Sequence, residues 1–89
     1  NMINDGKWIA FYQKSFSGKT YTYQVFSKHD NVLLGEIKWF PKFRKYSLFP
    51  EAETVFEITC LQDILNAIQT LENERRNSSK SNREISTTQ

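Results

Sequence analysis

The chain has 89 residues, of which 38% are hydrophobic and 15% aromatic, and its formal net charge is +2. This length predicts one domain with a small core, and the composition excludes an intrinsically disordered protein. The small net charge excludes nucleic-acid binding through overall electrostatics, so such binding would need a local cluster of cations. A single cysteine and a single histidine exclude an internal disulfide and a structural zinc site. No apolar run approaches the roughly 18 residues of a membrane span. We therefore expect no cofactor, no membrane partner and a cytoplasmic location.

Four stretches before residue 50 have the residue types and the alternation of half-buried strands. Gly18 and the polar residues 28–31 supply turn chemistry between them. Gly35 lies inside the third stretch, where it indicates a β-bulge or a close approach of backbone. Pro41 lacks an amide hydrogen and must end that strand, as Pro50 must end the next. The sequence predicts strands at residues 7–14, 20–27, 32–40 and 43–49.

One helix is predicted after an acidic stretch at residues 51–57. Thr59 followed by Gln62 fits a capping box, which satisfies the free backbone donors of a helix start. Residues 77–89 are polar apart from Ile85 and predict a disordered tail. Apolar residues recur at helical spacing and predict the buried face of the helix: Leu61, Ile64, Leu65, Ile68 and Leu71.

The order of these elements predicts an α+β fold. We expect a four-stranded antiparallel meander, β-β-β-β-α, packed on one C-terminal helix in two layers. A single domain at residues 7–76 would follow an N-terminal extension at residues 1–6.

The most unusual stretch is residues 38–46, the basic-aromatic segment, in which four cations interleave with four aromatic residues around Pro41. In a functional interpretation the cations attract phosphates, and the rings stack on bases at roughly 1–3 kcal/mol per base. In a structural interpretation the rings are core and the cations are solvated. If Trp39 and Tyr46 face the helix, the residues that remain outward are Lys38, Phe40, Lys45 and either Phe43 or Arg44. The candidate ligand-binding residues are Lys38, Trp39, Lys42, Phe43, Arg44, Lys45 and Tyr46.

Residues 35–40 resemble the first strand of the cold-shock domain, Gly-x-Val-Lys-Trp-Phe. Residues 44–49 stand where that family has its Lys-Gly-Phe-Gly-Phe motif, but Lys45 and Ser47 replace both glycines. A predicted helix also replaces the strands that would close the barrel. We interpret this likeness as convergence on a basic and aromatic strand pair.

A longer pattern is similar to a family of short uncharacterised proteins encoded by bacteriophages and prophages. The resemblance implies a small phage accessory protein in the cytoplasm of an infected bacterium, of the kind that counters host defence. The matching residues are the ranges 34–46, 48–50 and 54–56 and the run Cys-Leu-x-x-Ile at 60–64.

We expect a non-enzymatic protein that binds and sequesters a nucleotide or another phosphate-bearing ligand through the basic-aromatic segment. One alternative is an inhibitor that blocks a host defence enzyme, because Trp, Tyr and Arg are preferred anchors in protein interfaces. A nucleic-acid-binding module is another. The carboxylates of residues 51–57 could also meet the basic-aromatic segment of a second copy in a homodimer or higher oligomer.

Two further residues, His29 and Cys60, are of types that act as reactive groups in other proteins. His29 lies in a polar turn and is expected to be solvated, since a catalytic base needs a nucleophile and an orienting group within reach. Cys60 is expected to be a small buried residue, although the helix start could lower the pKa of its thiol. The sequence therefore predicts neither a catalytic nor a metal site.

Overall fold

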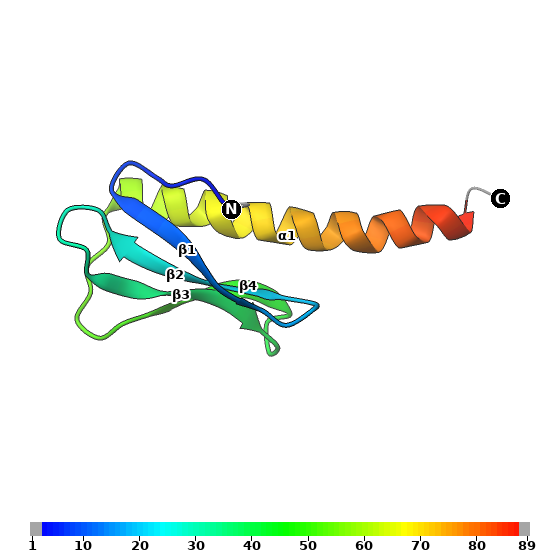
Figure 1. The fold of residues 1–89 in the computed structure, drawn as a ribbon, viewed down its shortest axis with the longest axis horizontal. Helices are drawn as coiled ribbons and strands as arrows, with labels where there is room; N and C mark the ends of the chain where they lie inside the picture. The colour runs from blue at the N-terminus through cyan, green and yellow to red at the C-terminus, as the bar shows by residue number, and fades with distance from the viewer. Residues whose placement is uncertain (1–2, 88–89) are drawn as a thin grey trace.

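The fold is a four-stranded antiparallel sheet followed by one helix (Figure 1). The computed structural model describes the backbone of residues 3–87 and the side chains of residues 3–77. Strands that follow one another in sequence are neighbours in the sheet, in the order β1-β2-β3-β4. This meander confirms the predicted α+β fold class. The elements are β1 (Ile9–Phe16), β2 (Tyr21–Ser27), β3 (Leu33–Phe40), β4 (Lys45–Pro50) and α1 (Ile58–Thr87).

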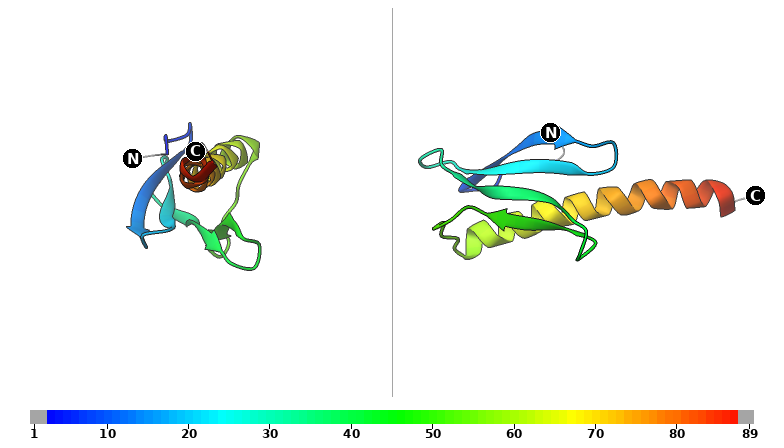
Figure 2. Two further views of the ribbon diagram at one scale, coloured as in Figure 1. Left: turned by 90° about the vertical axis from the view of Figure 1, so that its right-hand side faces the viewer. Right: turned by 90° about the horizontal axis from the view of Figure 1, so that it is seen from below.

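Helix α1 covers one face of the sheet and leaves the other face open (Figure 2). Side chains alternate across a strand, and in β2 and β3 every second residue is buried on the covered face, including Tyr23, Val25 and Ile37. In β1 the three consecutive residues 9–11 are all buried and the rest of the strand is exposed. Burial of the apolar residues on the covered face is the main source of stability. The core cluster comprises Ile3, Ile9, Phe11, Tyr23, Val25, Ile37, Tyr46, Ile64, Ala67 and Leu71.

Gly35 fulfils both predictions made for it. The register between β2 and β3 shifts between Val25 and Phe26, which pair with Gly35 and Leu33. A β-carbon at position 35 would lie 2.6 Å from the backbone oxygen of Phe49, so only glycine lets β4 approach this closely. The shift leaves Leu34 between the paired residues, and its side chain packs against the core.

The start of helix α1 is capped by Glu57. Its Oε1 accepts the N–H of Cys60 at 2.7 Å, and its backbone oxygen accepts the N–H of Leu61 at 2.9 Å. The predicted capping box of Thr59 and Gln62 is therefore wrong. Glu57, two residues before Thr59, satisfies the free donors, and its negative charge interacts favourably with the helix N-terminus. The hydrogen bond from Cys60 lowers the pKa of Glu57 below its ordinary value.

The buried face of α1 is rotated from the predicted one. Ile64 and Leu71 are buried as predicted, but Ala67 joins them, while Leu61 is 50% and Leu65 is 55% exposed. The prediction for these two leucines is wrong because the apolar stripe of the helix is wider than the part that the sheet covers. Leu65 therefore remains at the surface, next to β4.

Residues 3–6, predicted as an N-terminal extension, pack onto the domain. Ile3 is only 3% exposed, and the Asp5 Oδ1 accepts the N–H of Phe11 at 3.0 Å. That N–H lies on β1, an edge strand of the sheet, where a donor would otherwise face solvent. These residues therefore cover a sheet edge.

At the other end of the chain, the backbone of α1 continues beyond the sheet as far as Thr87 (Figure 1). The backbone of residues 77–87 is thus helical where the sequence predicts a disordered tail. Residues 88–89 and the side chains from residue 78 onward lie outside the described residues. The predicted disorder of residues 77–89 therefore stays a prediction.

Candidate functional site

Two of the seven candidate residues belong to the covered face of the sheet. Tyr46 is 4% exposed, and its hydroxyl accepts the N–H of Tyr21 at 3.1 Å. The N–H of Tyr46 donates to the Glu72 Oε2 at 2.6 Å, and burial raises the pKa of the Tyr46 hydroxyl. Trp39 packs against it edge to face, with the ring centroids 5.7 Å apart. Tyr46 therefore holds the helix to the sheet and lies away from solvent, which agrees with the structural interpretation.

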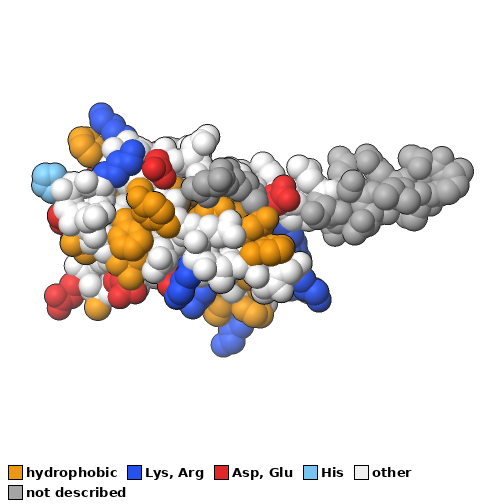
Figure 3. Space-filling model, viewed as in Figure 1, with side chains coloured by type: hydrophobic (Ala, Val, Ile, Leu, Met, Phe, Trp, Pro, Cys, Tyr) orange, Lys and Arg blue, Asp and Glu red, His pale blue; other side chains and the backbone are white. Residues whose placement is uncertain are grey.

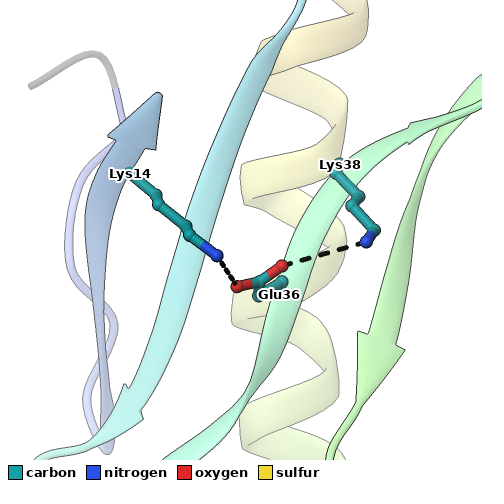
Figure 4. Close-up of polar contacts among 3 residues, drawn as sticks. All are labelled: Lys14, Glu36 and Lys38. Carbon is teal, nitrogen blue, oxygen red and sulfur yellow. Dashed lines mark hydrogen bonds and ion pairs between the residues drawn. The ribbon is translucent and has the colours of Figure 1, made fainter. Parts of the chain in front are cut away.

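Lys38 lies on the opposite, open face of the sheet (Figure 4). Its Nζ is 4.0 Å from Glu36, whose carboxylate also pairs with Lys14 at 2.8 Å. The same ammonium group lies over the ring of Phe49, 4.6 Å from its centroid. Lys38 is thus engaged in local contacts and is separated by the sheet from the groove described below.

Lys42, Phe43 and Arg44 form the exposed β3–β4 turn. The N–H groups of Phe43 and Arg44 donate to the backbone oxygen of Phe40 at 3.2 and 2.9 Å, which closes the turn. Arg44 adopts a φ of 54°, in the left-handed region that non-glycine residues rarely occupy. Phe43 remains 67% exposed, although its ring touches Phe40 edge to face. The turn therefore presents a ring and two cations to solvent.

A groove with a volume of about 420 Å³ lies between this turn and helix α1. The guanidinium of Arg75 lies over the ring of Trp39, 4.3 Å from its centroid, which fixes one wall of the groove. We call this site the basic groove. Its lining residues are Arg44, Lys45, Leu65, Ile68, Gln69, Glu72, Arg75 and Arg76.

Positive charge dominates the basic groove. Four cations line it, and its one carboxylate, Glu72, already accepts the N–H of Tyr46. Both ion pairs among the described side chains involve Glu36, on the open face, so neither neutralises a groove cation. An excess of cations in a concave surface raises the local concentration of anions. The geometry therefore favours an anionic ligand here.

The structure brings together two of the predicted residues, Arg44 and Lys45, and adds Arg75 and Arg76, which sequence reasoning missed. A helical signal for them exists. Leu65, Ile68 and Glu72 recur at spacings of three to four residues. Arg75 and Arg76 follow Glu72 at the same spacings, which places them on one side of α1 with the exposed Leu65. Nothing in the sequence, however, shows that this side of the helix adjoins the β3–β4 turn.

Neither reactive group considered above gains support. Burial, followed by the hydrogen bond with Glu57, raises the pKa of the Cys60 thiol, so the suggested lowering at the helix start is wrong. His29 is exposed. Within residues 3–77, no group of three or more His, Cys, Asp or Glu residues is arranged to hold a metal ion. In the described part of the chain, no helix has the length and apolarity needed to cross a membrane.

Comparison with protein-family models, curated proteins and solved structures finds no match for this chain. The resemblances to phage-encoded proteins and to the cold-shock domain therefore remain predictions from sequence.

Proposed function

We propose that this protein binds a phosphate-bearing ligand of the nucleotide class in the basic groove and sequesters it. One observation carries the proposal: Arg44 and Lys45 of the basic-aromatic segment meet Arg75 and Arg76 of α1 around one carboxylate. A phosphate group offers several anionic acceptors in a compact volume. Guanidinium groups hold such acceptors by paired, charge-assisted hydrogen bonds, so this cluster suits a phosphate better than a single carboxylate.

The apolar part of the groove supports a nucleotide over inorganic phosphate. Leu65 and Ile68 line the groove beside the cations, and Leu65 is 55% exposed. A base or sugar that covered Leu65 would remove apolar surface from water, at about 25 cal/mol per Å². Because Arg75 is already held over Trp39, its side chain loses less freedom when a ligand binds.

The proposed activity is binding without catalysis. The groove lining contains neither His nor Cys, Ser, Thr or Tyr, so it lacks the usual protein nucleophiles other than Lys45 and its carboxylate. Taken with the resemblance to phage-encoded proteins, sequestration in the host cytoplasm would remove a signalling nucleotide that bacterial defence requires. This counter-defence role is part of the proposal.

Titration calorimetry with ATP, pyrophosphate and adenosine tests the proposal. We expect ATP to bind more tightly than pyrophosphate, adenosine to bind weakly, and the affinity for ATP to fall as salt is added. Substituting Arg44→Gln and Arg76→Gln together should weaken ATP binding by about 100-fold, through loss of two charge-assisted contacts. The control, Lys19→Gln with Lys28→Gln, removes the same charge elsewhere and should leave binding within about twofold. Absence of ATP and pyrophosphate binding, or equal losses in both variants, would refute the proposal.

The open face of the sheet favours a nucleic-acid-binding module as a second candidate. Aromatic pairs stand at both sides of this face: Tyr12 with Phe26 and Phe40 with Phe49, each with ring centroids 5.6 Å apart. The ammonium group of Lys38 lies over the ring of Phe49 on this face. Bases can stack on such rings in a sequence-tolerant way. This candidate predicts binding of single-stranded oligonucleotides that strengthens with strand length and is lost in Tyr12→Ala, whereas the basic groove predicts no dependence on Tyr12.

Exposure of Phe43 favours a third candidate, an inhibitor that docks on a host protein. An aromatic side chain that is 67% exposed on a turn, between two cations, is the kind of residue that anchors protein interfaces. A packed protein interface tolerates salt better than a phosphate site does. The affinity for a purified target protein should therefore change little with salt concentration if the protein is an inhibitor. The affinity for a phosphate-bearing ligand should fall with salt concentration.

A further inference from the structure

The two ends of strand β3 carry opposite chemistry. At its start, a second groove of about 380 Å³ lies between the β2–β3 hairpin, residues 53–55 and the start of α1. We call it the end groove. Three apolar residues in its lining are well exposed, Trp8 at 48%, Val32 at 49% and Val55 at 87%. A monomer gains nothing from exposing these side chains together, so the end groove has the character of an interaction site.

Acidic residues lie at the same end. Asp30 and Glu53 line the end groove, and Glu51 is exposed nearby in sequence. Figure 3 shows carboxylates at the lower left of the molecule and cations below its middle, where the β3–β4 turn lies, with further cations at the upper left. An apolar groove with carboxylates in its lining suits a ligand that combines an apolar side chain with cations.

The chain itself presents a segment of that chemistry. The β3–β4 turn holds Phe43, 67% exposed, directly after Lys42 and before Arg44. The turn cannot reach the end groove of its own chain. Strand β3 separates the two with 8 residues, or about 25 Å at the usual rise of a strand. Any contact between them must therefore join two molecules.

We propose that Phe43 of one copy inserts into the end groove of another, with Lys42 placed beside Asp30 and Glu53 of that copy. The contact is heterologous, because the turn of one molecule meets a different surface of the next. The resulting pair keeps one free turn, on the second copy, and one free end groove, on the first. Association therefore continues beyond a dimer, into a chain or a ring, as concentration rises. This inference does not rest on the proposed ligand, since neither Lys42 nor Phe43 lines the basic groove.

Sedimentation velocity in a low-salt buffer without phosphate tests the proposal through complementation. Phe43→Glu removes the inserting ring and Val55→Lys blocks the end groove; both residues are largely exposed, so both variants should fold. We expect the mean mass of the wild type to rise past that of a dimer with concentration, and each variant alone to weaken association by at least about tenfold. An equimolar mixture should form heterodimers and stop there, because only one productive turn and one productive groove remain in each pair.

Matched substitutions outside the two surfaces serve as controls. Ile58→Lys and Phe16→Glu make the same chemical changes at exposed residues, 79% and 50% exposed, that do not line the end groove. Both should associate as the wild type does. A wild type that stays monomeric at sub-millimolar concentration would overturn the proposal. So would a closed dimer that neither Phe43→Glu nor Val55→Lys disrupts, or a mixture that stays monomeric. Circular dichroism of each variant verifies folding, and Phe43→Ala replaces Phe43→Glu should the latter unfold.

Discussion

The basic-aromatic segment divides into two halves with different physical roles. Trp39 and Tyr46 face helix α1, where Tyr46 is 4% exposed and hydrogen-bonded at both its hydroxyl and its backbone N–H. Lys42, Phe43 and Arg44 lie in the turn between them and face solvent. One part of the nine-residue segment thus fastens the helix to the sheet. The other part presents an aromatic ring and two cations to solvent.

The division follows from strand geometry. Residues 39 and 46 form a cross-strand pair, so their side chains lie on the same face of the sheet. The turn residues are not part of a strand, so their side chains do not alternate between the two faces of the sheet. An aromatic and basic composition therefore does not define a binding site by itself. The fold uses one half of the segment, and only the other half is available to a partner.

The largest expected effect on stability comes from a substitution in the half of the segment that faces helix α1, which contains Trp39 and Tyr46. Tyr46→Ala should lower the free energy of unfolding by about 3–5 kcal/mol, because it leaves a cavity and removes a buried hydrogen bond. A domain this small has little stability to lose, so the variant should be largely unfolded. Urea denaturation followed by circular dichroism measures the change. Phe43→Ala, in the outward half, should change the same free energy by less than about 0.5 kcal/mol; equal losses would remove the distinction.

A smaller effect is expected from the helix residue that Tyr46 binds. Glu72→Ala leaves the Tyr46 N–H without its acceptor and should cost about 1–2 kcal/mol. Glu74→Ala, an exposed carboxylate on the same helix, is the matched control and should have little effect. Urea denaturation of the two variants side by side gives the difference. No difference between them would show that this hydrogen bond does not fasten the helix to β4.

The smallest expected effect on stability comes from Glu57, the residue that caps helix α1 and lies outside the basic-aromatic segment. Hydrogen bonds in the folded state lower the pKa of Glu57, so its charged form stabilises the fold. That stability is fully present above its ordinary pKa of 4.5 and is lost as pH falls through the lower folded value. The melting temperature of Glu57→Gln should therefore lie slightly below that of the wild type near neutral pH. The gap should close toward about pH 3. A gap that is constant with pH would contradict this origin.

Most of the fold could be predicted because its signals are local. Alternation located the strands, and Gly35 and Pro41 marked the close approach and the strand end that the structure shows. The helix cap could not be predicted as well, because Glu57 and Thr59 both offer acceptors to a helix start. The breadth of the apolar stripe on α1 also does not reveal which part of it the sheet covers, and Leu61 and Leu65 remained exposed for that reason.

The candidate site was predictable only in part. Because side chains alternate along a strand, placing Trp39 and Tyr46 on the helix side correctly predicted that Lys38 lies on the open face and that Lys45 is exposed. The basic groove, however, depends on where α1 crosses the sheet. That crossing is set by packing of residues 64–71 and brings Arg75 and Arg76 beside a turn about 30 positions earlier in the chain. Sequence reasoning has no local signal for such a meeting.

The most direct test of the division within the segment is one variant measured in two ways. Arg44→Glu with Lys45→Glu reverses both segment cations that line the basic groove. We expect calorimetry to detect at least a 100-fold loss of ATP affinity, because two charge-assisted contacts are lost and the new carboxylates repel the phosphates. We also expect a melting temperature within about 3 °C of the wild type, since both residues are exposed. Unchanged ATP binding, or loss of binding that accompanies loss of folding, would contradict it.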